Sequence, residues 1–177
     1  MSDRRWRKWE LIGLFVTLIF GNLLHFVYNW SGKDRIVAAF AATNESTWEH
    51  MKLLFVPMFL FSVVQVCVLG KTYPNFLAVR AVSIVTGLTL IPVLYYTYTG
   101  AWGQMRDWAN IAVFFLAALG AFLLDCSLLR RNRLSSPWQQ VLGLVMLWAL
   151  AFCFVWCTFR PFHIALWRDP LTGTYGI

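Results

Sequence analysis

The stretch LIGLFVTLIFGNLLHFVYNW, residues 11–30, decides the fold because it is a run of twenty almost entirely apolar residues. An α-helix needs about 20 such residues to cross the hydrocarbon core of a bilayer. The run is too long for the apolar region of a signal peptide and lacks its small-residue cleavage site. It is therefore expected to stay in the protein as a membrane span.

Four further apolar stretches follow it, joined by short connections: residues 51–69, 76–96, 108–129 and 138–159. Over the whole chain 59% of residues are hydrophobic and only 13% are charged, whereas soluble domains carry about 25% charged residues. We predict an all-α fold in which residues 1–177 form a single domain, a polytopic membrane bundle of five transmembrane helices.

The distribution of lysine and arginine predicts how this bundle is oriented. With the N-terminus in the cytoplasm, that side of the membrane carries nine of these residues and the opposite side six. Because cytoplasmic loops are enriched in positive charge, the N-terminus is expected to be cytoplasmic and the C-terminus extracytoplasmic. Topology and anionic lipid headgroups then explain the net charge of +7, and no nucleic-acid partner is expected.

This orientation gathers most of the polar chemistry at the outer face. His25 lies near the outer end of the first span, NESTWEH (44–50) opens the second, and the C-terminal tail with His163 follows the fifth. Pro161 ends that last span, because proline interrupts a helix. The tail is rich in turn-forming residues and is expected to fold back over the outer mouth as a lid.

Residues 44–49 contain a signal for the start of a helix. Ser46 and Glu49 fit a capping box, in which the serine oxygen accepts from the Glu49 N–H and the glutamate reaches back to the serine N–H. Asn44 is an alternative cap. One cap needs one carboxylate, so three nearby ionisable residues are left over: Glu45, His50 and Lys52.

These surplus residues are candidates for a functional site. Glu45, Glu49 and Lys52 are spaced i, i+4 and i+7, so in a helix they share one face, with His50 on an adjacent face. Ionisable groups close to hydrocarbon are costly unless they face the bundle interior or a wet cavity. His25 lies a short loop away; the alternative for it is a hydrogen bond to a neighbouring backbone carbonyl.

The residue types in this region suit a metal. Two or three histidines with one or two carboxylates can hold zinc or another divalent metal, and the candidate ligands are His25, His50, Glu45 and His163. The candidate catalytic residues are Glu49, Glu45 and Lys52. A glutamate would act as general base to a metal-bound water, and the lysine would steady an anionic group.

Three functions fit these residues. The first is a metal-dependent membrane enzyme, a hydrolase acting on a lipid or envelope substrate. The second is a small-solute or ion transporter, with the carboxylates as its coupling site. The third is a non-catalytic subunit that docks on a membrane partner protein. The lipid bilayer is the expected environment in each case, and a transporter built from so short a chain would need to form a homo-oligomer.

Two further expectations concern residues away from this site. Asp125, near the cytoplasmic end of the fourth span, is expected to pair with Arg80 or with the Arg130 and Arg131 cluster. The apolar segment 36–42 is too short to cross a membrane and is expected to dip into the interface or to form a short surface helix.

Several sequence strings together resemble a known family. They are H-x-x-x-x-W at 25–30, NESTWEHMK at 44–52, YYTYTG at 95–100 and DPLTGTYGI at 169–177. The chain resembles small bacterial integral membrane proteins of unknown function that share an N-E-S-x-W-E-H-x-K motif. The resemblance implies a five-helix protein of the bacterial inner membrane. It marks His25, Glu45, Glu49, His50 and Lys52 as motif positions without assigning them roles.

Overall fold

The computed structural model describes residues 3–70 and 72–177, and it is built from helices. Five of them are long and apolar enough to span a membrane: α1 (Asp3–Trp30), α3 (Thr47–Leu69), α4 (Phe76–Trp102), α5 (Asp107–Arg130) and α6 (Pro137–Phe159). The prediction of an all-α bundle with five spans is confirmed. Among the basic residues counted for orientation, Lys71 and the side chains of Arg4 and Arg5 lie outside the described part of the chain.

The long helices extend beyond the predicted spans, most clearly α1 and α4. Helix α1 begins at Asp3, whereas the predicted span begins at residue 11. The predicted span starts later because an apolar count excludes the charged residues in the first turns of the helix. Helix α4 continues past residue 96 to Trp102. It ends there because Gly103 adopts a left-handed conformation, φ 71°, and donates its N–H to the carbonyl of Thr99.

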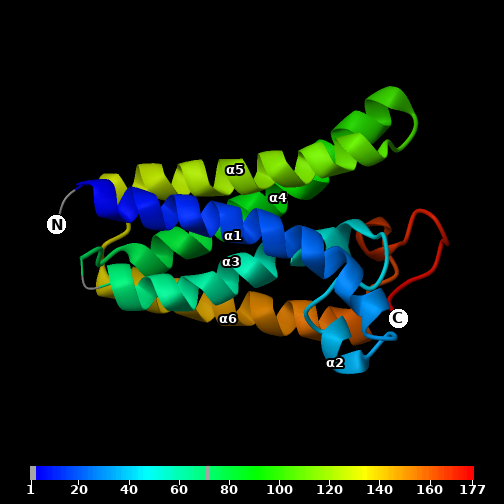
Figure 1. Ribbon diagram of the computed structural model, residues 1–177, viewed down its shortest axis with the longest axis horizontal. Coiled ribbons are helices and arrows are strands. Elements are labelled where there is room, and N and C mark those ends of the chain that lie inside the picture. Colours follow the sequence, from blue (N-terminus) through cyan, green and yellow to red (C-terminus); the bar gives the residue numbers. More distant parts are fainter. Residues whose placement is uncertain (1–2, 71) are drawn as a thin grey trace.

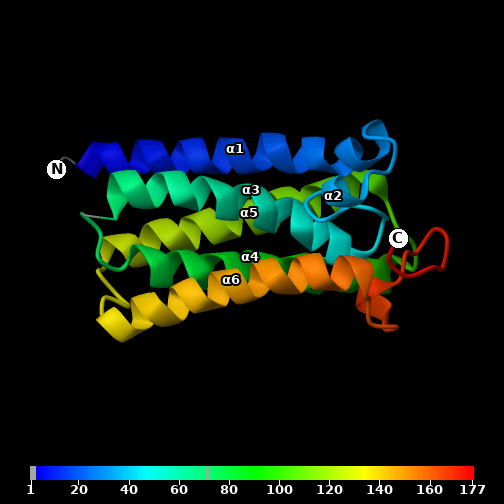
Figure 2. The ribbon, with the colours of Figure 1, turned by 90° about the horizontal axis from the view of Figure 1, so that it is seen from below.

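The long helices run side by side along the longest axis of the molecule, and the two chain termini lie at opposite ends of the bundle (Figure 1). Helix α3 is central: 56% of its most apolar window is buried, against 22% for α1. Seen from below, α1 and α6 lie on opposite sides of it (Figure 2). The outer helices expose large apolar side chains such as Phe15 and Phe152, which suits contact with lipid.

Glycines let some helices approach closely. A Cβ added at Gly143 on α6 would lie 2.7 Å from the Cα of Ala78 on α4. A Cβ at Gly21 on α1 would lie 2.7 Å from the carbonyl oxygen of Leu53 on α3. Because real side chains do not approach this closely, both helix pairs depend on glycine at these positions.

A short helix, α2 (Arg35–Ala38), follows α1. The Asp34 carboxylate caps it by accepting from the N–H groups of Ile36 and Val37, at 2.8 and 3.1 Å. Ala38 and Ala41 are buried against Tyr28. This segment is the short surface helix that its limited apolar length predicted.

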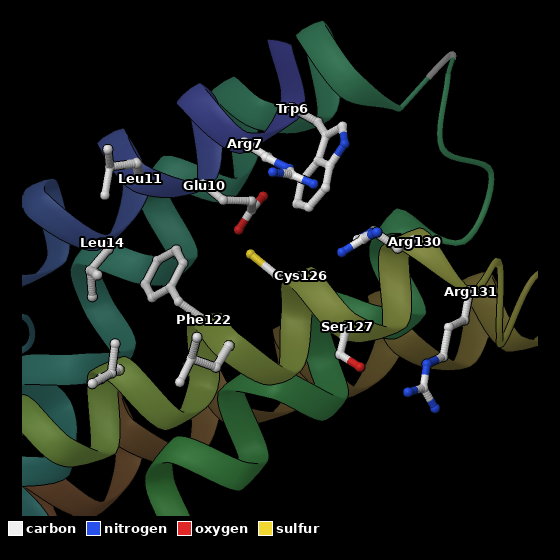
Figure 3. Close-up of a pocket in the computed structure, with 12 residues that line it drawn as sticks. Trp6, Arg7, Glu10, Leu11, Leu14, Phe122, Cys126, Ser127, Arg130 and Arg131 are labelled. Carbon is white, nitrogen blue, oxygen red and sulfur yellow. The ribbon is translucent and has the colours of Figure 1, made fainter. Parts of the chain in front are cut away.

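A buried charged network ties four helices together near the N-terminal end of the bundle. The Arg80 guanidinium is fully buried, and its Nη2 lies 2.7 Å from the Asp125 carboxylate. The same nitrogen donates to Glu10 at 3.0 Å and to Gln65 at 2.9 Å. The predicted pairing of Asp125 with Arg80 is confirmed. Glu10 and Gln65 are additional members, and Glu10 points from α1 toward the space beside α5 (Figure 3).

Candidate functional site

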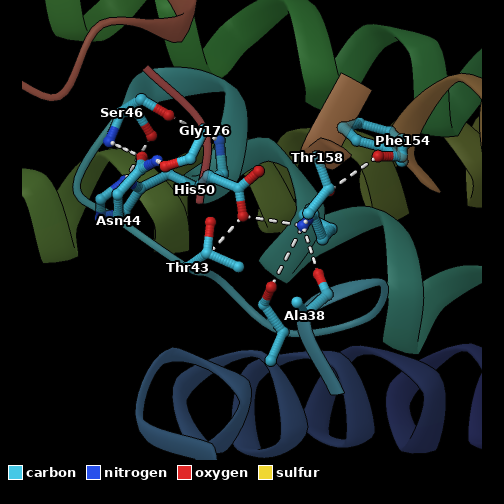
Figure 4. Close-up of polar contacts among 11 residues, drawn as sticks. Ala38, Thr43, Asn44, Ser46, His50, Phe154, Thr158 and Gly176 are labelled. Carbon is cyan, nitrogen blue, oxygen red and sulfur yellow. Dashed lines mark hydrogen bonds and ion pairs between the residues drawn. The ribbon is translucent and has the colours of Figure 1, made fainter. Parts of the chain in front are cut away.

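The turn before α3 is capped by a set of hydrogen bonds that differs from that of a capping box. Ser46 is the N-cap, and its hydroxyl accepts from the Glu49 N–H at 3.3 Å, as predicted. The reciprocal bond was predicted wrongly: the Ser46 N–H donates to the Asn44 side chain at 2.9 Å. Glu49 accepts instead from the Thr43 N–H at 2.9 Å (Figure 4). Asn44 and Glu49 thus each hold part of the turn.

Lys52 is buried beneath this turn and joins three segments of the chain. Its Nζ donates to the Glu49 carboxylate at 2.7 Å and to Thr158 on α6 at 2.7 Å. It also donates to the carbonyls of Ala38 and Ala41, at 3.0 and 3.1 Å (Figure 4). A buried lysine needs such partners to offset its lost hydration. Glu49 and Lys52 therefore hold α3, α6 and the α2 segment together.

His25, Glu45 and His50 form a second, more accessible cluster. The Nε2 of His25 lies 3.7 Å from one Glu45 oxygen, and the Nε2 of His50 lies 3.6 Å from the other. The centroids of the two imidazole rings are 5.4 Å apart. One ligand atom from each of the three residues falls within 4.8 Å of the others, and all three side chains are partly exposed.

These separations suit a bridging ion better than direct hydrogen bonds. Nitrogen and oxygen atoms 3.6 to 3.7 Å apart are beyond ordinary hydrogen-bond distance. Metal–ligand distances of about 2.0–2.2 Å in tetrahedral geometry place neighbouring ligand atoms roughly 3.3–3.6 Å apart. Because one ligand atom from each of the three residues lies within 4.8 Å of the others, the side chains would have to move somewhat closer together to hold one ion.

A hydrogen bond orients the His50 ring for this task. Its Nδ1 lies 3.0 Å from the Ser46 carbonyl oxygen. A carbonyl only accepts, so Nδ1 carries the hydrogen, and in the neutral ring the Nε2 lone pair faces Glu45. Histidines that bind metals are oriented in the same way. The Nδ1 of His25 is buried and has no hydrogen-bond partner among the described residues.

Two cavities adjoin the cluster. The larger, of about 230 Å³, is bordered by His25 and by residues of α1, α3 and α5. The smaller, of about 70 Å³, reaches toward α4 and the C-terminal tail. Five residues border both cavities: Glu45, His50, Asp107, Asn110 and Phe114. Asp107, the first residue of α5, is the carboxylate that sequence reasoning did not include in the site.

The C-terminal tail folds back over this end of the bundle, as its turn-forming residues predicted. The Asn44 side chain donates to the Gly176 carbonyl at 3.0 Å, and Trp167 stacks on Trp48 with ring centroids 4.6 Å apart. Leu171 borders the smaller cavity. His163 lies elsewhere on the tail, its ring 4.7 Å from that of Tyr175, and it does not join the His25, Glu45 and His50 cluster.

The structure thus divides the predicted site residues into two groups. His25, Glu45 and His50 meet beside the cavities, whereas Glu49 and Lys52 form a buried pair that borders neither cavity. The expectation that Glu45, Glu49 and Lys52 share one helical face fails because α3 begins at Thr47, which leaves Glu45 in the preceding turn.

The fold and this cluster define a multi-pass helical membrane protein with a polar site at the C-terminal end of its bundle. The chain belongs to DUF6512, a family of unknown function whose model matches residues 1–177. The resemblance to a family of unknown function is thereby confirmed. No curated protein and no solved structure matches the chain.

Proposed function

We propose that this protein is a metal-dependent membrane hydrolase whose ion is held by His25, Glu45 and His50. The observation that supports it is the convergence of two imidazoles and one carboxylate beside a cavity. Catalytic zinc sites commonly use three protein ligands, including the His₂Glu set, and leave a fourth position for water or substrate. Zinc is the metal that suits this donor set best, and another divalent metal with similar preferences is the alternative.

Each residue at the site has a proposed role. Glu45 and the two histidines hold the ion, and the Ser46 carbonyl keeps the His50 ring in place. The bound ion would polarise a water molecule so that it loses a proton near neutral pH. Asp107 borders both cavities and is the proposed proton acceptor, since Glu49 is engaged by Lys52 and by the Thr43 N–H.

The position of the larger cavity favours a lipid-like ester as substrate. Phe26 on α1 and Ile111 on α5 border it and are 50% and 56% exposed on the apolar surface of the bundle. A substrate dissolved in the bilayer could therefore enter sideways between these helices. The asymmetry of lysine and arginine supports an outward-facing site, and we propose a bacterial inner membrane as its location.

Hydrolysis of fluorogenic carboxylic- and phosphoric-ester lipids by the protein in liposomes tests this proposal. Zinc is expected to support the reaction and a chelator to abolish it. Asp107→Asn should reduce the rate by about 10²–10⁴-fold, the usual contribution of a general base, without loss of metal. Asp34→Asn is the matched control, because asparagine caps α2 as well as aspartate does. Hydrolysis that continues unchanged in the presence of the chelator, or full activity in Asp107→Asn, would overturn the proposal.

Transport is the second candidate function, and one observation favours it. The Glu10, Arg80 and Asp125 network places buried ionisable groups near the N-terminal end of the bundle, opposite the histidine cluster. Intramembrane charges often mark ion or proton pathways. Zinc or proton flux into liposomes that is lost in Glu45→Gln, together with no ester hydrolysis, would establish transport instead.

A further inference from the structure

A third cavity lies at the other end of the molecule, between α1 and α5 near the start of α1. It has a volume of about 850 Å³, within the range of pockets that bind drug-sized ligands. The two helices run antiparallel, so residues early in α1 face residues late in α5 (Figure 1). Among the described residues, the cavity is lined by residues of α1 and α5 and by Arg131, which directly follows α5, and we call it the α1–α5 groove.

The end of the groove near the membrane boundary is positively charged. Arg7 extends into it from α1, and Arg130 extends toward it from α5 (Figure 3). Arg131, the residue that follows α5, also lines it, and both Arg130 and Arg131 are exposed. Glu10 is the one carboxylate among the described residues that line the groove, and it accepts hydrogen bonds of 3.0 and 3.2 Å from Arg80. No ion pair among the described residues engages Arg130 or Arg131, so an anion at this end of the groove would meet the positive charge of these two arginines.

The groove becomes apolar toward the middle of the bundle. It is lined there by Leu11 and Leu14 on α1 and by Leu119 and Leu123 on α5. At 1.5 Å per helical residue, Leu14 lies roughly 10 Å further along α1 than Arg7. Leu11 and Leu123 are 54% and 61% exposed, so this part of the groove opens toward lipid hydrocarbon.

We propose that the α1–α5 groove binds an anionic phospholipid. Its phosphate would lie against Arg130 and Arg131, and an acyl chain would lie along the leucines. Guanidinium groups bind phosphate oxygens well because they offer paired N–H donors. Free phosphate would leave the apolar part of the groove uncovered, and a zwitterionic lipid would lack the net charge that the arginines favour. The site lies at the opposite end of the bundle from the histidine cluster, so it does not depend on the proposed enzymatic function.

Native mass spectrometry of the purified full-length protein, titrated with phosphatidylglycerol or with phosphatidylcholine, tests this proposal. The protein should retain phosphatidylglycerol preferentially. Arg130→Gln should weaken that binding about fivefold, the effect of roughly one basic residue at an anionic lipid surface. Arg133→Gln is the matched control, because Arg133 is exposed in the adjacent loop, does not line the groove and carries the same charge.

A second variant tests the groove itself rather than its charge. Ser127→Trp would fill the groove between its charged and apolar parts and should reduce phosphatidylglycerol binding while the helix content measured by circular dichroism is unchanged. Equal retention of both lipids, or equal effects of Arg130→Gln and Arg133→Gln, would overturn the proposal. So would inorganic phosphate displacing the lipid completely, or a second protein occupying the groove.

Discussion

The carbonyl oxygen of Ser46 accepts a hydrogen bond from Nδ1 of His50, at 3.0 Å. Ser46 is also the residue that caps α3. One residue therefore starts the helix with its side chain and orients a candidate metal ligand with its backbone. Stability of the helix start and geometry of the site depend on different atoms of this residue, so a substitution can separate them.

Ser46→Ala removes the capping hydroxyl and keeps the carbonyl. We expect it to lower the free energy of unfolding by about 1 kcal/mol, the usual cost of losing an N-cap, and to leave bound metal unchanged. Thermal unfolding in detergent, followed by tryptophan fluorescence, measures the first effect, and elemental analysis measures the second. Loss of metal in a folded Ser46→Ala protein would mean that the hydroxyl itself supports the site.

Lys52→Met should be among the most damaging single substitutions. It leaves the Glu49 carboxylate buried without its cation and removes the bonds to Ala38, Ala41 and Thr158. Breaking a buried ion pair in this way costs about 3–5 kcal/mol. Lys8→Met, at an exposed position on α1, is the control and should unfold like the natural protein. Adding Glu49→Gln to Lys52→Met should recover part of the loss; no recovery would show that the ion pair is not the cause.

Substitution of Arg80 should lower the stability of the protein much more than substitution of its partner Glu10. Arg80→Met leaves Glu10 and Asp125 buried without a cation and should lower stability by about 3–5 kcal/mol. Glu10→Gln keeps an oxygen that can accept from Arg80 and Gln65, so it should cost much less. Chemical unfolding of the two variants in detergent compares them. Equal destabilisation would mean that the charge of Glu10, and not its hydrogen bonding, is what the network needs.

Gly143→Ala tests the close contact of α4 with α6. The added methyl group would lie 2.7 Å from the Ala78 Cα and 2.8 Å from the Leu77 carbonyl, and neither backbone atom can move away freely. Overpacking of this kind costs about 1–3 kcal/mol. Gly100→Ala is the control, because no atom lies within 4 Å of the added carbon, and it should be neutral or slightly stabilising. Similar unfolding temperatures for both variants would contradict the packing.

Sequence reasoning predicted the spans well because span length and apolar content follow directly from the thickness of the bilayer. It was less successful where charged residues enter the bundle. Glu10 was left outside the first span because apolar counting stops at a charge, although burial beside Arg80 and Gln65 makes that charge tolerable. Such pairing depends on which helices become neighbours, and the sequence alone does not specify this.

For the candidate site, too, sequence reasoning predicted one part correctly and missed another. The surplus of ionisable residues around the start of α3 correctly indicated where polar groups gather. Helical spacing wrongly placed Glu45 on one face with Glu49 and Lys52, because Glu45 precedes the helix. It turns instead toward His25 and His50, with which it was also predicted as a metal ligand. Asp107 is the first residue of α5, and only the packing of α5 beside α1 and α3 brings it to the cavities.

The metal content of the detergent-purified protein shows whether the His25, Glu45 and His50 cluster binds an ion. Elemental mass spectrometry should find close to one zinc or other transition-metal ion per chain, and His50→Ala should lose it. His163→Ala should retain the metal, because His163 lies apart from the cluster against Tyr175. Absence of metal from the natural protein after growth and purification with added zinc, or its equal loss in both variants, would contradict the account.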